Sequence, residues 1–247
     1  MFLLLLPLFT VVQAQENADA APADDNTFPH NLFPQKAISR FSAGVFAGKD
    51  NNHHDINTWY ADDMKYTDLP GYTAGVSFGY HPTGWFSLCA DVAMVQKNYR
   101  MDRDNPYVSY MYTESTNDYL SVPVTAMLSV GRTVRLCGYF GGYAGYWMSG
   151  HREGKSLPIL SSMTSGYDDE ITCFDQDYEF NSVRDNRFDA GLVYGAGLHC
   201  AIVKKIDLSL EVRWYYALTD IQKAYTRNIN PRYNTTRAIQ FGVAYWF

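Results

Sequence analysis

The 247-residue sequence has few cysteines, no excess of positive charge and no catalytic signature. Its 4 cysteines form no Cys-x-x-Cys pair, so a zinc site with the usual spacing has no support. The formal net charge of -6 gives no basic surface for nucleic acid. The GxSxG, Walker and HExxH motifs are absent. We therefore expect no enzyme, no cofactor, no metal site and no nucleic-acid partner.

Long apolar runs are also lacking, apart from one at the start. Residues 1–12 are apolar except for Pro7 and Thr10, and the small residues Val12 and Ala14 suit cleavage before Gln15. The run is too short to cross roughly 30 Å of hydrocarbon, which predicts a signal peptide at residues 1–14 rather than an anchor. Residues 15–37 are rich in Ala, Asp, Asn and Pro and predict a flexible periplasmic lead-in. Any later membrane crossing must use strands.

Eight segments alternate between apolar residues and small or polar ones. In residues 206–216, one face would carry Leu208, Leu210 and Val212, and the other would carry Glu211 and Arg213. A helix would mix these two sets, whereas a strand separates them. The eight predicted strands cover residues 41–48, 71–80, 86–97, 119–129, 134–147, 191–202, 206–216 and 238–247. Pro123 cannot donate a ladder hydrogen bond, so we expect a bulge at that position.

The connections between these strands alternate in length. Residues 81–85, 130–133 and 203–206 are short, whereas residues 49–70, 100–118, 148–187 and 218–234 are long and polar. Short turns at one end and long loops at the other are typical of outer-membrane barrels, with periplasmic turns and extracellular loops. The predicted fold for residues 38–247 is all-β, an eight-stranded antiparallel up-and-down transmembrane β-barrel with four long extracellular loops.

Alternation alone does not say whether the apolar face points outward to lipid. A secreted lipocalin-like barrel alternates in the same way, but its apolar face points inward. Two features favour an apolar exterior. The interior of an eight-stranded barrel is narrow, and nine glycines share the face that holds the charges: Gly44, Gly48, Gly75, Gly79, Gly141, Gly145, Gly191, Gly195 and Gly197. Aromatic residues also gather at the two ends of the apolar face, as interfacial girdles do: Tyr72, Tyr146, Trp214 and Tyr216 at one end, and Tyr80, Phe86, Tyr245 and Phe247 at the other.

The interior would then hold six charged residues. An uncompensated charge in a narrow lumen costs several kcal/mol, so we expect these groups to pair and close the pore. The predicted interior charge network is Asp91, Lys97, Arg135, Asp207, Glu211 and Arg213. On the same grounds His199 is interpreted as a satisfied interior histidine.

Several other residues could bind ligands. His53, His54 and Asp55 could bind a metal, but a solvated loop is favoured. The acidic residues of the third long loop could attract calcium, but they lack the spacing of a calcium loop: Asp168, Asp169, Glu170, Asp175, Asp177 and Glu179. Tyr107, Tyr110 and Tyr112 fit a recognition surface or packing at the barrel rim equally well. The oxidising compartment allows a disulfide among Cys89, Cys137, Cys173 and Cys200 but does not imply one.

The chain from about residue 41 onward resembles the PorT-like outer-membrane barrel family. The matching segments are YLSVPV at residues 119–124, GLVYGAGL at residues 191–198, LSLEVRWYYALTDI at residues 208–221 and FGVAYWF at residues 241–247. The resemblance implies a location in the outer membrane of a diderm, Gram-negative bacterium. It also implies that Tyr245 and Phe247 form the signal read by the barrel-assembly machinery. The family takes its name from a member linked to protein secretion, which says little about activity here.

Three functions follow. The first is a closed, non-enzymatic barrel with a structural or surface-interaction role, whose partners are outer-membrane lipid and lipopolysaccharide. The second is an accessory of protein secretion or transport, with secretion components as partners. The third is the secreted lipocalin-like binder.

Overall fold

The computed structural model describes residues 40–56, 64–103, 111–156, 172–203, 205–223 and 232–247. Contacts divide the chain into two units, Met1–Leu32 and Phe33–Phe247, and every described residue belongs to the second. The predicted signal peptide at residues 1–14 and the lead-in at residues 15–37 therefore lie outside the described residues. Within the described ranges, no helix is both long enough and apolar enough to span a membrane.

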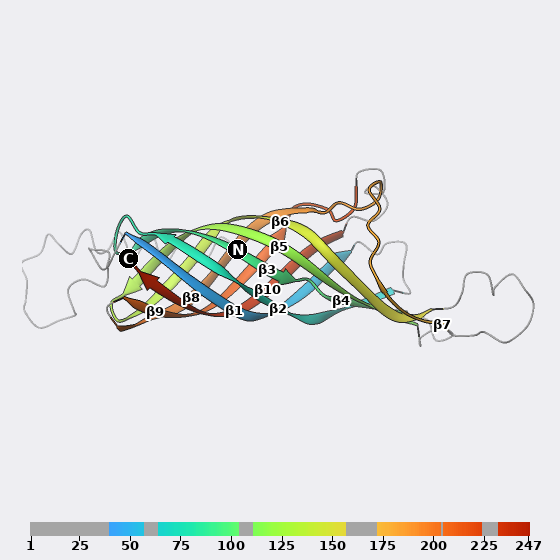
Figure 1. Ribbon diagram of the computed structural model, residues 1–247, viewed down its shortest axis with the longest axis horizontal. Coiled ribbons are helices and arrows are strands. Elements are labelled where there is room, and N and C mark those ends of the chain that lie inside the picture. The colour runs from blue at the N-terminus through green and yellow to red at the C-terminus, as the bar shows by residue number, and fades with distance from the viewer. Residues whose placement is uncertain (1–39, 57–63, 104–110, 157–171, 204, 224–231) are drawn as a thin grey trace, which may run out of the picture. The chain divides into compact units, whose positions relative to one another are not determined.

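The described part of the chain forms ten strands in a single sheet (Figure 1). The strands are β1 (Phe41–Ile56), β2 (Met64–Tyr80), β3 (Phe86–Gln96), β4 (Tyr99–Arg103), β5 (Tyr112–Gly131), β6 (Val134–Ser156), β7 (Thr172–Asp177), β8 (Phe188–Val203), β9 (Ile206–Ala217) and β10 (Arg232–Trp246). Every pairing is antiparallel.

The sheet closes on itself. The first strand, β1, pairs with both β2 and β10. The ring continues from β2 through β3, β5, β6, β8 and β9 back to β10. Strand β4 pairs with β2 and β5 just beyond β3, and β7 extends the sheet beside the far part of β6. Closure leaves no open sheet edge along the ring, which makes this part of the chain a β-barrel.

The strand number and the loop boundaries differ from the prediction. Ten strands are present among the described residues where eight were predicted, because β4 and β7 lie in segments predicted as loops. The neighbouring strands also run further: β1 continues to Ile56, β5 begins at Tyr112 and β6 continues to Ser156. In these extensions both faces are polar, so the hydropathy alternation ends while backbone pairing continues. Of the residues predicted as loops, 57–63, 104–110, 157–171 and 224–231 lie outside the described ones.

The predicted bulge at Pro123 was wrong. Pro123 lies opposite Tyr143 in unbroken register with β6, and the register shift falls between Asp118 and Tyr119. On the other side, the ladder with β3 skips from the Ala90–Val124 pair to the Ala93–Ser121 pair. The interruption falls where a proline provides no N–H.

The two faces of the barrel wall differ sharply in exposure. Leu210 and Phe241 point outward with exposed fractions of 52 % and 53 %. Asp207 and Arg213 point inward and are only 2 % and 4 % exposed. A water-soluble barrel would place apolar residues inside, so an apolar exterior around a charged interior requires a lipid surrounding.

Glycines let neighbouring backbones approach inside this narrow wall. A Cβ atom at Gly141 would lie 2.0 Å from the Val124 carbonyl oxygen, and one at Gly191 would lie 2.0 Å from that of Tyr216. By contrast, a Cβ atom at the outward-facing Gly138 would meet nothing within 4 Å. Gly141 and Gly191 therefore have a steric reason to lack a side chain.

Candidate functional site

The six charged residues predicted for the interior all lie inside the barrel, and each contacts a group of opposite charge. Arg213 is the centre of one group: its Nη1 lies 2.5 Å from Asp91 Oδ2, and its Nη2 lies 2.7 Å from Glu211 Oε2. These residues come from β3 and β9, which lie on opposite sides of the ring. The Arg213–Asp91 pair therefore crosses the lumen, whereas the Arg213–Glu211 pair lies along β9.

A histidine extends this group toward the end of the barrel where the short turns lie. His199 Nε2 is 3.2 Å from Glu211 Oε1, and His199 Nδ1 is 3.6 Å from Asp207 Oδ2. Asp207 in turn pairs with Arg135. The Tyr139 hydroxyl lies 2.5 Å from His199 Nε2. The result is a continuous chain of charges from Arg213 to Arg135, in which His199 joins two carboxylates.

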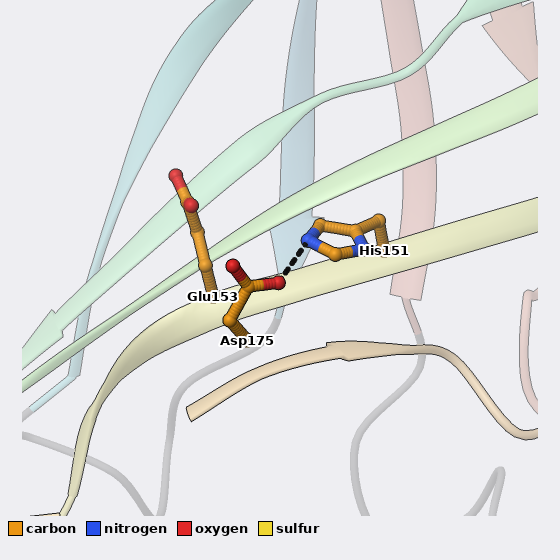
Figure 2. A group of neighbouring side chains, drawn as sticks. All are labelled: His151, Glu153 and Asp175. Atoms are coloured by element: carbon orange, nitrogen blue, oxygen red, sulfur yellow. Dashed lines mark ion pairs between the residues drawn. The ribbon is translucent and has the colours of Figure 1, made fainter. Parts of the chain in front are cut away.

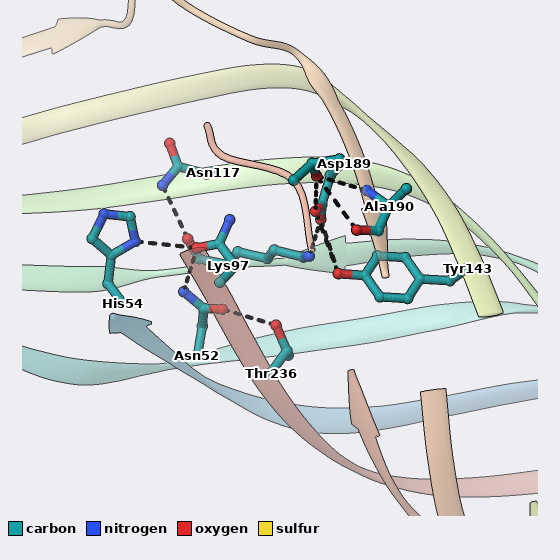
Figure 3. Close-up of polar contacts among 10 residues, drawn as sticks. Asn52, His54, Lys97, Asn117, Tyr143, Asp189, Ala190 and Thr236 are labelled. Atoms are coloured by element: carbon teal, nitrogen blue, oxygen red, sulfur yellow. Dashed lines mark hydrogen bonds and ion pairs between the residues drawn. The ribbon is translucent and has the colours of Figure 1, made fainter. Parts of the chain in front are cut away.

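The third interior cation, Lys97, pairs with Asp189 nearer the long-loop end (Figure 3). The Tyr143 hydroxyl donates to Asp189 Oδ1 at 3.3 Å, and Thr219 Oγ1 donates to the same oxygen at 3.2 Å. The Lys97 ammonium also lies 4.9 Å from the centre of the Tyr119 ring. Sequence reasoning missed Asp189 because the predicted sixth strand began at residue 191. The same alternation, continued two residues back, places Asp189 on the inward face.

Little space remains around the first group. One cavity of about 60 Å³ lies among Asp91, His199, Asp207, Glu211 and Arg213, enough for only a few waters. Breaking a buried pair by removing one partner typically costs 3–5 kcal/mol, so these residues hold one another in place.

At the long-loop end the charges give way to a layer of amides and a histidine (Figure 3). Asn52 Nδ2 donates to Asn234 Oδ1 at 3.2 Å, and His54 Nδ1 donates to the same oxygen at 3.1 Å. Thr236 donates to Asn52 Oδ1 at 2.8 Å. Asn117 Nδ2 donates to the Lys97 carbonyl at 3.0 Å.

The interpretation of His53 and His54 as parts of a solvated loop was wrong for His54. The side chain of His54 is 3 % exposed, and its ring stacks on Tyr99 with centroids 4.5 Å apart. His53 points outward from the same strand and pairs with Asp68 at 2.8 Å. Because β1 extends through both residues, its alternation sends them to opposite faces.

Two cavities lie next to this layer at the long-loop end of the barrel. The first has a volume of about 190 Å³ and is lined by His54, Tyr99, Asn117, Tyr119, Trp147, Arg152, Tyr178, Arg184, Asp185, Ile221, Gln222, Arg232 and Asn234. The second has a volume of about 530 Å³ and is lined by Tyr66, Tyr99, Met101, Thr113, Ser115, Arg152, Ser156, Phe174, Gln176 and Arg232. The two share Tyr99, Arg152 and Arg232. We call them together the mouth cavity.

The arginines of the mouth cavity differ in their partners. Arg184 Nε pairs with Asp185 Oδ1 at 2.7 Å. The Arg152 guanidinium lies 4.1 Å from the centre of the Tyr178 ring, and no described carboxylate pairs with it. Arg232 likewise has no carboxylate partner among the described residues, and its buried Nε has no hydrogen-bond partner there. Sequence reasoning did not single out either arginine.

Beyond the ring, β6 and β7 form a ribbon that carries a histidine between two aspartates. His151 Nε2 lies 2.9 Å from Asp175 Oδ1, and His151 Nδ1 lies 3.1 Å from Asp177 Oδ1. The hydrogen bond to Asp177, followed by the charge of Asp175, raises the pKa of His151 above its ordinary value of 6.5. Figure 2 shows Glu153 beside His151 and Asp175, so three side chains able to ligate a metal lie together on this ribbon.

The predicted acidic loop is therefore partly strand. Asp175 and Asp177 belong to β7, and both contact His151 on β6. Asp168, Asp169 and Glu170 lie outside the described residues. Tyr107 and Tyr110 also lie outside the described residues. Tyr112 is the first residue of β5, and the Arg100 guanidinium lies 4.3 Å from the centre of its ring.

All four cysteines are free thiols. Cys137 is buried with Met127 and Tyr139, and Cys89 packs against this cluster from β3. Both therefore lie on the inward side of the wall. Cys200 lies next to Leu198 and Ile202 on β8, and Cys173 is exposed on β7.

Aromatic side chains lie outward near the end where the short turns lie. Tyr245 and Phe247 are 44 % and 65 % exposed, with ring centroids 5.4 Å apart. Phe41 and Tyr80 form a similar outward pair, also at 5.4 Å. Toward the other end, Tyr72 is 70 % exposed. These positions suit rings that anchor at a membrane interface.

A closed antiparallel barrel with an apolar exterior and an ion-paired interior is the architecture of proteins of bacterial outer membranes. The family model described as outer membrane protein beta-barrel domain matches residues 13–223. The chain belongs to this family, and its location is the outer membrane of a Gram-negative bacterium. The secreted lipocalin-like alternative is thereby overturned. The resemblance to PorT-like barrels stays a prediction.

The chain is also similar to several solved outer-membrane proteins. The attachment invasion locus protein Ail of Yersinia pestis is 12% identical, with 83% of this chain and 97% of that chain covered and a TM-score of 0.40. Neisserial surface protein A is 14% identical, with 85% and 98% covered and a TM-score of 0.43. OprG of Pseudomonas aeruginosa is 11% identical, with 88% and 100% covered and a TM-score of 0.42. No curated protein matches the chain.

Proposed function

We propose that the protein is a closed, non-enzymatic outer-membrane barrel of eight membrane-crossing strands that contacts its surroundings through its long-loop end. The short turns face the periplasm and the long loops face the exterior. The eight strands of the ring cross the membrane, while β4 and β7 belong to the part beyond it. Strand length supports this division: β5 and β6 have 20 and 23 residues, whereas about 9–11 residues cross a bilayer.

The observation that carries the closed state is the set of ion pairs across the lumen. Arg213 reaches Asp91 from the opposite side of the ring, and Lys97 on the β3 side reaches Asp189 on β8. Ions would have to displace these pairs to pass. The network therefore supports a plug and a structural role for the six predicted charges.

Planar bilayers test the plug. Purified full-length protein should show no stable open channel. The double variant Asp91→Ala/Arg213→Ala removes one cross-lumen pair and should admit measurable ion current. The outward variant Leu210→Ala is the matched control and should stay silent. A stable open channel in the unaltered protein would contradict the proposal.

The extended ends of β5, β6 and β7 support a surface-interaction role. They extend an antiparallel ribbon beyond the membrane, where lipopolysaccharide and external partners are available. Crosslinking on whole cells, followed by capture of the protein, tests this role. Recovery of lipopolysaccharide would support it, whereas recovery of secretion components would favour the accessory role that the PorT-like resemblance implies.

The outward position of Tyr245 and Phe247 supports a role as the assembly signal, because both rings are available to the barrel-assembly machinery. Phe247→Ala should lower the amount of barrel inserted in the outer membrane. Phe41→Ala, which removes an outward ring at the same end, is the matched control. Equal insertion of the two variants would contradict this assignment.

A further inference from the structure

We propose that the mouth cavity binds an anionic saccharide, a sugar that carries a carboxylate or a phosphate. This inference deepens the proposed surface role and rests on the long-loop end facing the exterior. It does not depend on whether the barrel conducts ions.

The charge of the cavity is the first argument. Arg152 and Arg232 line both of its parts, and no carboxylate of the described chain pairs with either. This differs from the rest of the interior, where Lys97, Arg135 and Arg213 each have a carboxylate partner. Two guanidinium groups without counter-charges on one cavity point to an anion supplied from outside. Carboxylate and phosphate match the planar fork of arginine best.

The floor of the cavity is the second argument, and it is independent of the arginines. His54 is 3 % exposed, and its Nδ1 donates to Asn234. This leaves Nε2 as the acceptor nitrogen of the neutral ring, and it is buried with no hydrogen-bond partner in the described structure. A buried polar atom without a partner is costly, and a hydroxyl group of a ligand would satisfy it.

The walls supply the third argument. Tyr66, Tyr99 and Phe174 line the larger part of the cavity, so aromatic rings border the space. The C–H face of a sugar packs on such rings, while its hydroxyl groups reach the polar floor. Parts of about 190 Å³ and about 530 Å³ place the cavity within the roughly 300–1,000 Å³ of small-ligand sites.

Calorimetry on full-length protein in detergent micelles tests the proposal. Glucuronate and glucose 6-phosphate should bind. Glucose, which lacks the anionic group, and inorganic phosphate, which lacks the sugar, should each bind at least about tenfold more weakly. Glucose binding as tightly as the two acids would overturn recognition of charge. Inorganic phosphate binding as tightly as glucose 6-phosphate would overturn recognition of the sugar. Absence of binding by both acids would overturn the proposal.

Variants locate the site. Arg152→Gln and Arg232→Gln should each weaken binding of glucuronate about tenfold or more, and Arg152→Lys should retain part of it. Arg237→Gln is the matched control, because Arg237 lies on β10 with Arg232 but points outward. Heat-modifiable gel migration shows that each variant is folded. Equal binding by Arg237→Gln and Arg232→Gln would overturn the assignment of the cavity.

The saccharide has two sources, a free sugar outside the cell or the core of lipopolysaccharide in the same membrane. Core oligosaccharide released from lipopolysaccharide should compete for the site in the same titration. Tighter binding of the core than of glucuronate assigns the lipid-borne source, and weaker binding assigns the free one. A conducting channel in bilayers would refute the plug while leaving these titrations unaffected, so the two proposals fail separately.

Discussion

The two halves of the barrel interior treat positive charge differently. Toward the short turns, Arg135 and Arg213 are buried and paired with carboxylates of the same chain. Toward the long loops, Arg152 and Arg232 border a cavity without a described carboxylate partner. A buried cation whose partner is built in serves the stability of the fold. A cation that is partly exposed and has no such partner is available for recognition.

The largest expected effect comes from breaking the paired half. Arg213→Ala leaves Asp91 buried without its ion-pair partner and Glu211 with His199 alone, and it should lower the free energy of unfolding by about 3–5 kcal/mol. Urea unfolding in lipid vesicles measures it. Adding Asp91→Asn and Glu211→Gln should recover part of the loss, because the stranded charges are removed. A loss below about 1 kcal/mol for Arg213→Ala would mean that the network does not stabilise the barrel.

The next effect concerns the outside of the same wall. Leu210 lies at the centre of the apolar face of β9 and is 52 % exposed. Leu210→Arg places a charge in lipid and should cost about 2–4 kcal/mol in the same vesicle assay. Leu210→Phe keeps the site apolar and is the control. Equal stability of the two variants would show that this face does not meet hydrocarbon.

A smaller effect separates the inward and outward glycines of β6. At Gly141 an added Cβ would lie 2.0 Å from the Val124 carbonyl, so Gly141→Ala should cost about 1–3 kcal/mol. Gly138→Ala meets nothing within 4 Å and should leave stability nearly unchanged. Thermal unfolding of both variants checks the difference. A larger loss at residue 138 would reverse the assignment of inside and outside.

Truncating the arginines of the mouth cavity should scarcely affect the stability of the fold. Arg152→Ala and Arg232→Ala remove guanidinium groups that have no carboxylate partner in the described chain, and each should change the free energy of unfolding by less than about 1 kcal/mol. Urea unfolding alongside Arg213→Ala makes the comparison direct. If either mouth variant were as damaging as Arg213→Ala, the contrast between the two halves would disappear.

The smallest expected effect is a dependence on pH in the β6–β7 ribbon. Asp177 and Asp175 raise the pKa of His151 above 6.5, so the folded ribbon favours the protonated ring. The stabilisation is therefore fully present below pH 6.5 and is lost as the pH rises through the raised value. Hydrogen exchange of β7 amides, corrected for intrinsic rates, should show stronger protection at low pH. His151→Gln should remove this dependence, and its persistence in that variant would contradict the role of His151.

The regular part of the fold could be predicted from the sequence. Alternation in β9 identified Asp207, Glu211 and Arg213 as one face, because a strand sends alternate side chains to opposite sides. Asp189 carried the same signal two residues before the predicted sixth strand. The prediction of an outer-membrane barrel followed from this alternation and from the alternating loop lengths, and the family model confirms it.

The candidate binding site could not be predicted in the same way. Arg152 and Arg232 lie in segments that are polar on both faces, where hydropathy gives no period to follow. His54 looked solvated for the same reason, although β1 carries it into the interior. Only the register of pairing shows which of these polar residues share a cavity.

By itself the sequence determined that the chain crosses the membrane with strands, and which side chains face lipid or lumen. It could do so because those two surroundings differ strongly in polarity, so each leaves its own mark on alternate residues. The tertiary structure alone decided how far the strands continue, that Lys97 meets Asp189, and that Arg152 and Arg232 share one cavity. Those contacts depend on register and closure of the ring, which bring together residues that no local pattern relates.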